Sequence, residues 1–394
     1  MLRIVIALTL FVLFVSYLPV GCGSSGGGGS GTVEQTSQPV ATAVVVTAIR
    51  DLGAIPVNSM ILKRDCGFSA MFGGKSVWLF GDTTLRTPPA GDCVLLSNTV
   101  STTFDLDAGD GIDGMSERVD RVGAPAEFFP LTVEEQEYNA RHAGEFCEVE
   151  PCDAHWGIWP GTIIVDKRKD WAYVFYRKVH IETGFFKFHH VGHSLAIWKD
   201  PDGPVERPVF HYVDSYPTLF FSESELAMGS ASLVMGDEAY VYGCELGQDK
   251  LGKPCHLARV AFADILDKTA WTFYSGNGLW SPDSTQAKVV FHGNDMMSVS
   301  FNPYLNRYMA VYSEPLAAKA MLRTATKPEG PWSEPVALFT VDAPENAHGW
   351  VYDFLAHPEY SQDNGRIIYV TYTMKLDQMH SETRLMAVEL DIAH

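Results

Sequence analysis

The sequence predicts an all-β fold, a five-bladed β-propeller with four antiparallel strands in each blade. Helical periodicity is scarce, whereas short apolar or alternating runs broken by Gly, Pro, Asn and Asp recur along the chain. One unit, made of a strand, a turn and an aromatic-rich return strand, occurs five times. Such units form blades whose innermost strands line a central channel. A two-sheet sandwich is the alternative fold, but it would not explain why hairpins and paired outer strands alternate.

The clearest unit covers residues 65–85. Two apolar runs, residues 69–72 and 77–80, flank the turn Gly73-Gly74-Lys75-Ser76, and its glycines supply the positive φ angles that a tight hairpin needs. An antiparallel hairpin returns the chain to the edge where it started. We therefore expect Asp65, just before the first strand, and Asp82, just after the second, to share one end of the sheet.

Four further hairpins follow, in residues 161–176, 230–242, 297–312 and 351–373. After the middle three, additional apolar runs predict the third and fourth strands of a blade; these are residues 194–200 and 207–212, 257–265 and 271–276, and 321–335 and 336–340. The early run 43–49 and the C-terminal run 384–390 are expected to close the ring together. The propeller domain is thus predicted to cover residues 43–394.

The first 42 residues predict export. A positive start, an apolar stretch over residues 4–20 and Gly21-Cys22 are typical of a secretory signal. The run before Cys22 resembles a bacterial lipobox, with Pro19 where Leu is usual. We predict a lipoprotein signal over residues 1–22 with the lipid on Cys22; an ordinary cleaved signal is the alternative. Residues 23–42 are a flexible Gly/Ser-rich tether. The chain is expected at the cell surface or in the periplasm, reaching the membrane only through its lipid.

Composition narrows the partners and cofactors. A formal net charge of −19 disfavours nucleic acid and anionic lipid. The six cysteines after Cys22 favour disulfides, and their spacing favours the pairs Cys66–Cys93, Cys147–Cys152 and Cys244–Cys255. We find no zinc-type spacing, phosphate-binding loop, GxSxG or HExxH motif, and expect no cofactor, although a cation buried in the channel is left open. We also expect a monomer.

The histidines at positions 189, 190 and 193 could suggest a metal site. They fall in a predicted loop with no obvious carboxylate partner. We therefore expect His189, His190 and His193 to be exposed side chains without a metal.

The propeller geometry predicts a single polar mouth. Every inner strand runs in the same direction, so residues before inner strands and after second strands gather at one end of the channel. Carboxylates, an arginine and aromatic residues occupy many of these positions, namely Asp65, Asp82, Trp156, Trp159, Arg177, Glu225, Glu245, Asn294, Asp295, Glu314, Trp350, Tyr352 and Thr373. Aromatic faces stack on sugar rings and charged groups bind sugar hydroxyls. The mouth therefore favours a polysaccharide or oligosaccharide partner.

Cleavage of a glycosidic bond needs one protonated carboxylic acid and one carboxylate. Crowded carboxylates raise one another's pKa, which allows both states near neutral pH. We assign catalysis to Asp65, Asp82 and Glu245, and substrate binding to Trp156, Trp159, Arg177, Asp295, Glu314 and Tyr352. Each assignment has a structural alternative. Asp82 would cap a turn, Asp65 would fix a loop, the glutamates would be solvated at strand ends, and the tryptophans would pack between blades.

The chain also resembles a known family, the domain-of-unknown-function 4185 proteins, in the segments SAMFGGKSVWLFGDTTL, SVSFNPYLNRYMAVYS and LRTATKPEGPWSEPVALF. More distantly it is similar to the five-bladed propellers of arabinanase, fructosidase and related glycoside hydrolases. Some members of the first family are endo-acting arabinanases that attack the D-arabinan of actinobacterial cell envelopes. The resemblance implies the same fold and, by motif position, a catalytic role for Asp65 and Asp82. The insertion 105–153 matches no part of this pattern.

These observations predict an exported, lipid-anchored glycoside hydrolase that acts on a polysaccharide such as an arabinan-like furanoside. The rival is a non-catalytic carbohydrate-binding or adhesion propeller, which an Asp82 buried against backbone amides would favour. A third reading, a scaffold that contacts proteins through the propeller rim, predicts an exposed apolar patch on a side face.

Overall fold

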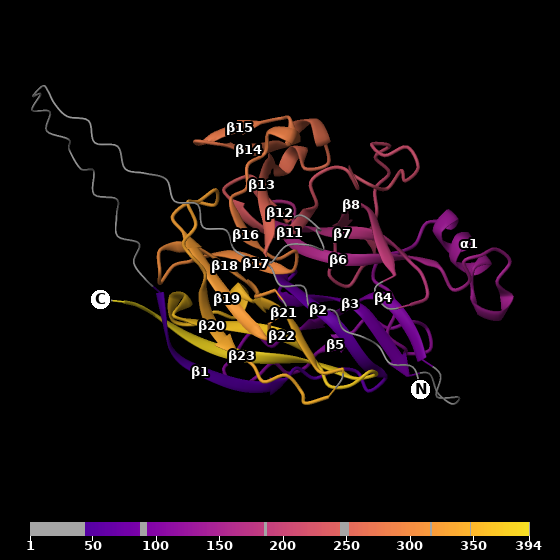
Figure 1. Cartoon of the computed structure of the whole chain (residues 1–394), viewed down its shortest axis with the longest axis horizontal. Helices are drawn as coiled ribbons and strands as arrows, with labels where there is room; N and C mark the ends of the chain where they lie inside the picture. The colour runs from indigo at the N-terminus through magenta and orange to yellow at the C-terminus, as the bar shows by residue number, and fades with distance from the viewer. Residues whose placement is uncertain are drawn as a thin grey trace, which may run out of the picture. The chain divides into compact units, whose positions relative to one another are not determined.

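The computed structural model describes residues 44–86, 93–184, 187–244, 252–315, 317–346 and 348–393. Within them the chain forms five antiparallel sheets, arranged as the blades of a propeller (Figure 1). The innermost strands of the five sheets contact one another in a closed ring. The predicted five-bladed, all-β fold is confirmed. The predicted signal, Cys22 and the tether lie outside the described residues.

Each blade begins with its innermost strand. Blade 1 contains β2 (Ile61–Phe72), β3 (Lys75–Arg86), β4 (Cys93–Thr103) and β5 (Ser116–Glu117). Blade 2 contains β6 (His155–Asp166), β7 (Trp171–Ile181), β8 (Phe188–Trp198) and the short β9 (Val205–Glu206) and β10 (Phe221–Ser222). Blade 3 contains β11 (Met228–Met235), β12 (Glu238–Cys244), β13 (Lys253–Ala261), β14 (Thr272–Gly276), β15 (Leu279–Ser281) and β16 (Phe291–Gly293).

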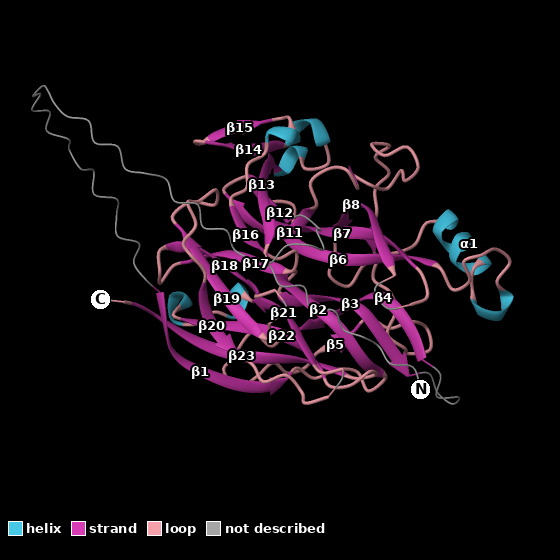
Figure 2. Cartoon of the chain, in the orientation of Figure 1, coloured by secondary structure: helices cyan, strands magenta, loops and turns pink. Residues whose placement is uncertain are grey.

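Blade 4 contains β17 (Met297–Asn302), β18 (Arg307–Ser313), β19 (Lys319–Ala325) and β20 (Val336–Thr340). Blade 5 contains β21 (Trp350–Ala356), β22 (Ile367–Lys375), β23 (Ser381–Ile392) and β1 (Val44–Ala54). Helix is scarce, as Figure 2 shows. It comprises α1 (Val133–Arg141) and short 3-10 turns at Gly144–Phe146, Phe262–Asp264, Lys268–Ala270, Ser284–Gln286, Pro358–Tyr360 and Asp363–Gly365.

The first hairpin has the predicted turn but longer strands. Gly73 and Gly74 adopt φ angles of 56° and 77°, as a tight turn between right-twisted strands requires. The ladder extends well beyond the two apolar runs, so Asp65 lies inside β2 and Asp82 inside β3. Asp65 pairs with Gly81, the residue before Asp82. The two carboxyl-bearing residues therefore share one end of the hairpin, as expected, but within the sheet rather than beyond it.

The ends of the chain close the ring. β1 pairs antiparallel with β23, with Val44 opposite Ile392 and Ala54 opposite Arg384. Figure 1 shows the two strands side by side along blade 5. This closure confirms the predicted pairing of the early and C-terminal runs. The first described strand and the last are therefore joined by backbone hydrogen bonds within one blade, and these bonds close the ring.

The hydrophobic core lies mainly between blades. Successive side chains on a strand point to opposite faces, and β3 is buried on both. Val77 and Leu79 belong to a cluster shared with blade 2, whereas Trp78 and Phe80 belong to one shared with blade 5. Corresponding clusters fill the other three interfaces between blades. The apolar runs of the inner hairpins are therefore continuous, because each blade needs two buried faces.

Blade 2 departs from the prediction. Residues 207–212 were expected to form its fourth strand, but they form no strand, and this prediction is wrong. Pro208 has no backbone N–H to donate to a ladder. The buried Arg207 side chain instead binds Glu135 of α1, with 2.6 Å between Arg207 Nη1 and Glu135 Oε2. Lys178 Nζ lies 2.7 Å from the other oxygen of Glu135. These ion pairs attach α1, and with it the insertion 105–153, to blade 2.

Two of the three predicted disulfides are present. Cys147 is bonded to Cys152, and Cys244 to Cys255. The predicted Cys66–Cys93 bond is wrong, because Cys66 is a buried free thiol. Its side chain packs with Phe68 and with Leu355 of the inner strand β21. In the part of the chain that the structure describes, no helix is long and apolar enough to span a membrane.

Candidate active site

Three aspartates from two neighbouring blades lie near the buried Cys66 thiol and form an aspartate cluster. Asp65 and Asp82 come from the hairpin of blade 1, and Asp353 comes from β21 of blade 5. The backbone N–H of Cys66 donates a hydrogen bond of 3.1 Å to Asp353 Oδ2. Burial, and then the charges of all three carboxylates, raise the pKa of the Cys66 thiol. Sequence reasoning missed Asp353, although it directly follows the predicted site residue Tyr352.

Irregular backbone places these carboxyl groups. The register of β2 against β3 shifts on both sides of the Asp65–Cys66 pair, and that of β21 shifts just after Tyr352. Cys66, Asp82 and Asp353 have φ angles of 67°, 31° and 55°. Bulges redirect side chains, and aspartate tolerates the left-handed region better than most residues. Such conformations cluster at functional sites, so their presence here supports a functional role.

Two aromatic donors hold the blade 1 carboxylates. The Tyr352 hydroxyl donates to Asp65 Oδ1 at 2.5 Å, and the Trp159 indole N–H donates to Asp82 Oδ1 at 2.8 Å. Both donors stabilise the ionised form of the carboxyl group that they contact. The structure therefore brings together four of the predicted site residues. The buried Asp82 carboxyl group is held both by a side chain of the next blade and by a backbone hydrogen bond.

Burial raises the pKa of all three carboxyl groups. Burial raises the pKa of Asp65, and the Tyr352 hydrogen bond opposes that rise. Burial and the neighbouring Asp65 raise the pKa of Asp82 to about 7, and burial and Asp65 raise that of Asp353 to about 8. All three residues are half-buried. The site can therefore hold protonated and ionised carboxyl groups side by side near neutral pH.

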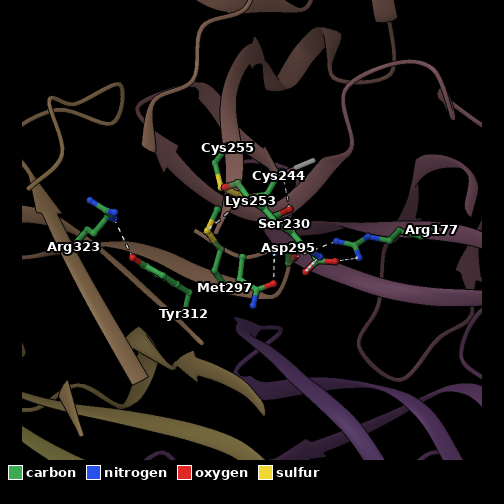
Figure 3. The surroundings of a disulfide bond; sticks show 10 residues. Arg177, Ser230, Cys244, Lys253, Cys255, Asp295, Met297, Tyr312 and Arg323 are labelled. Carbon is green, nitrogen blue, oxygen red and sulfur yellow. Dashed lines mark hydrogen bonds and ion pairs between the residues drawn. A yellow bond between two sulfur atoms is a disulfide. The ribbon is translucent and has the colours of Figure 1, made fainter. Parts of the chain in front are cut away.

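A group of three charged residues, Arg177, Asp295 and Lys253, lies beside the three aspartates. Arg177 Nη1 is 2.9 Å from Asp295 Oδ2, and Lys253 Nζ is 2.6 Å from Asp295 Oδ1. Burial disfavours the ionised Asp295, but the two cations outweigh it and hold its pKa well below the ordinary value. Figure 3 shows Arg177 and Asp295 pointing toward each other beside the Cys244–Cys255 disulfide. That bond ties the end of β12 to β13, the strand that carries Lys253.

A cleft of about 900 Å³ opens next to these residues. It is lined by Trp159, Arg177, Asp295 and Lys253, by the histidines of β8, and by the segment before β11. The expectation that the three histidines lie in a loop is wrong, and the expectation that they are exposed is wrong for two of them. All three lie in β8; only His189 is exposed, while His190 is half-buried and His193 is 2% exposed. Among the described residues, no group of three or more His, Cys, Asp or Glu side chains is arranged to hold a metal ion.

The remaining predicted site residues lie elsewhere. Trp156 packs against Tyr138, His180 and Tyr216, next to the core between blades 1 and 2. Glu314 forms an ion pair with Lys319 at 2.6 Å. Glu245 lies outside the described residues. The structure thus divides the predicted set into an aspartate cluster, a neighbouring Arg177–Asp295 group, and residues with contacts of their own.

A family profile described as Domain of unknown function (DUF4185) matches residues 59–377. The chain belongs to this family. The match covers all five inner hairpins of the DUF4185 domain and every described residue of the aspartate cluster. No curated protein matches the chain.

Solved structures similar to the DUF4185 domain include a candidate hydrolase from Bacteroides ovatus, at 14% identity and a TM-score of 0.56, covering 84% of this chain and 87% of that one. A GH43 enzyme from Xanthomonas citri has 14% identity and a TM-score of 0.47, with 87% and 91% covered. A GH43 β-xylosidase/α-arabinofuranosidase from a compost microbial metagenome has 12% identity and a TM-score of 0.45, with 89% and 95% covered. At this identity, the likeness to the first structure shows a shared fold.

Proposed function

We propose that this protein is an exported glycoside hydrolase that cleaves a polysaccharide with Asp82 and Asp65. The observation that carries the proposal is the unequal environment of two adjacent carboxyl groups. Burial and the charge of Asp65 raise the pKa of Asp82 to about 7. At Asp65 burial alone raises the pKa, and Tyr352, Lys63 and Lys375 oppose that rise. Glycoside hydrolysis needs this combination of one acid and one carboxylate.

In the proposed reaction Asp82 is the general acid. Its proton goes to the glycosidic oxygen as the bond from that oxygen to the anomeric carbon breaks, and Asp82 is left ionised. Asp65 either takes a proton from the water that attacks the anomeric carbon or attacks that carbon itself, and water then completes hydrolysis. The separation of the two carboxyl groups in the substrate complex decides between these routes.

Asp353 has a supporting role in this proposal. Its carboxyl group, with a pKa of about 8, is mostly protonated at neutral pH and so adds little negative charge beside Asp65. The Cys66 N–H fixes its orientation. A neutral Asp353 leaves Asp65 as the principal anion of the cluster, which is what a carboxylate facing a developing positive charge at the anomeric carbon requires.

The substrate class proposed is a furanose-containing polysaccharide such as an arabinan, on the family resemblance given above. The proposed location is the outside of the cell membrane, with the lipid on Cys22 as anchor. Two disulfides support an oxidising compartment, since such bonds are rare in the cytosol.

The test is incubation of the purified protein with D-arabinan, L-arabinan, xylan and levan, followed by size analysis of the products. We expect shortening of at least one polymer, and no shortening by a chain carrying Asp82→Asn. Binding of a polymer without any cleavage would contradict the hydrolase and favour the carbohydrate-binding alternative. If the protein neither binds nor cleaves any of the four polymers, both the hydrolase and the carbohydrate-binding alternative are contradicted.

A further inference from the structure

The cleft of about 900 Å³ adjoins the aspartate cluster through Trp159. Trp159 belongs to both, because its indole N–H binds Asp82 while its side chain lines the cleft. The Trp159 ring lies 4.9 Å from the Phe188 ring and 5.6 Å from the His190 ring, in edge-to-face arrangements. A sugar chain held at Asp82 therefore meets this aromatic wall next, and then the side chains of β8 behind it.

His193 in this wall has an unusual environment. It is 2% exposed, yet neither ring nitrogen has a hydrogen-bond partner among the described residues. His190 Nδ1 is likewise buried without a partner, and the two rings lie nearly parallel with their centroids 6.3 Å apart. A buried polar atom without a partner is destabilising and needs an explanation. Both residues line the cleft, so a ligand there can supply the missing hydrogen bonds.

The histidines are neutral under ordinary conditions. Burial and the nearby Arg177 lower the pKa of His190 to about 3 and that of His193 well below its usual value. A neutral imidazole has one donor and one acceptor, whereas a charged one has only donors. Sugar hydroxyls both donate and accept hydrogen bonds. A pair of neutral imidazoles therefore suits adjacent hydroxyls on one sugar ring better than it suits an anion.

The charges around the cleft also disfavour an anionic ligand. Arg177 and Lys253 already bind Asp295, and Lys268 binds Glu225. Glu223 lies on the same wall as Glu225. A uronate or phosphate would therefore meet carboxylates and cations that already have a partner. The lining favours a polymer without charged groups.

We propose that His190 and His193 form a sugar-binding subsite that hydrogen-bonds the hydroxyls of an uncharged residue next to the scissile bond. The proposal rests on the proposed hydrolase for the position of that bond, and goes beyond it by assigning the subsite and the charge of the substrate. Sugar binding then provides the partners that the two histidines lack in the protein alone.

The test measures binding in a background that does not cleave. Chains carrying Asp65→Asn and Asp82→Asn, with or without His193→Phe, are titrated with arabinan, xylan, levan and polygalacturonate in affinity electrophoresis. We expect an uncharged polymer to bind and polygalacturonate not to bind. His193→Phe should weaken binding about tenfold, the effect of losing one or two hydrogen bonds. His193→Gln, which keeps a donor and an acceptor, should bind within about threefold of its parent.

Thermal unfolding of the same chains separates binding from structure. A phenylalanine of similar volume removes two unpartnered polar atoms, so His193→Phe should leave the melting temperature unchanged or raise it. A large fall in melting temperature would assign His193 a structural role and overturn the proposal. Unchanged binding in His193→Phe, stronger binding of polygalacturonate, or no binding of any uncharged polymer would also overturn it. Loss of binding in His193→Phe, together with no cleavage by the wild type, would contradict the hydrolase but keep the subsite.

Discussion

The indole nitrogen of Trp159 lies 2.8 Å from Asp82 Oδ1, although the two residues are 77 positions apart in the chain and belong to different blades. This hydrogen bond joins the inner strand of blade 2 to the second strand of blade 1. It also connects the proposed acid to the wall of the neighbouring cleft. The properties of the acid therefore depend on how the first two blades fit together.

Replacing Trp159 by phenylalanine should change the pH profile of hydrolysis. The N–H of Trp159 favours the ionised Asp82, so its loss raises the pKa of Asp82 above about 7. The acid then stays protonated to higher pH, and the alkaline limb of the rate profile should move upward. The maximal rate should fall about tenfold, because the N–H of Trp159 no longer stabilises the negative charge that Asp82 gains as it gives up its proton.

The measurement is the initial rate of hydrolysis from about pH 4 to about pH 9. This range contains both ordinary and raised carboxyl pKa values. Trp156→Phe is the matched control, since Trp156 packs against Tyr138 and His180 away from Asp82. An alkaline limb that stays in place or moves downward in Trp159→Phe would show that this bond does not set the acidity of Asp82.

The raised carboxyl pKa values predict how stability varies with pH. Asp82 and Asp353 have pKa values of about 7 and about 8 in the folded chain, whereas the ordinary value is 3.8. Between these limits the folded chain holds protons that the unfolded chain has lost, so stability falls as pH rises. The contribution is fully present below about pH 4 and lost by about pH 8, and is on the order of 2 kcal/mol per carboxyl group because both residues are half-buried.

A chain with Asp82→Asn and Asp353→Asn isolates this contribution, because asparagine resembles the protonated acid at every pH. The melting temperature of the wild type minus that of this variant should decrease between about pH 4 and about pH 8. The two carboxyl groups lose their protons over this range. Titrating groups away from the aspartate cluster affect both chains alike. A constant difference, or one that increases with pH, would mean that these carboxyl groups ionise normally in the folded protein.

The Cys244–Cys255 disulfide should stabilise the protein and the cleft together. It closes a segment with a sequence separation of 11, which in the loop-entropy account is worth about 3 kcal/mol. It also holds β13, and Lys253 on it, beside Asp295. Replacing both cysteines by alanine should lower the free energy of unfolding by about that amount and weaken polymer binding.

The Cys147–Cys152 bond provides a control for the same experiment. Its sequence separation is 5, and it lies in the insertion that contacts blade 2 through α1. Its removal should cost about 2 kcal/mol in denaturant unfolding and leave polymer binding unchanged. Equal losses of binding in the two variants would show that the Cys244–Cys255 disulfide has no particular connection to the cleft.

The sequence was sufficient for the fold because the five inner hairpins are local. Each consists of two apolar runs and a turn, and these features survive in β2–β3, β6–β7, β11–β12, β17–β18 and β21–β22. The outer part of blade 2 was not predictable, since residues 207–212 are apolar enough for a strand but Arg207 is bound to Glu135, which lies far away in the sequence. Long-range ion pairs of this kind leave no local pattern.

The site was predictable only in part. Strand ends located Asp65 and Asp82, but Asp353 reaches the cluster through a bulge inside β21, and bulges have no reliable sequence pattern. His193 was misjudged for a related reason. Three polar histidines suggested a loop, while the strand they belong to is set by pairing with β7, where Arg177 lies opposite His193.

The most direct test of the central claim is the rate at which new reducing ends appear when arabinan, xylan or levan is incubated with the wild type and with Asp65→Asn, Asp82→Asn and Asp267→Asn. Asp267 is an exposed residue that caps a 3-10 turn. We predict release by the wild type and by Asp267→Asn, and a loss of about a hundredfold or more in each of the other two. Equal release by all four chains, or release by none, would contradict a hydrolase that works through Asp65 and Asp82.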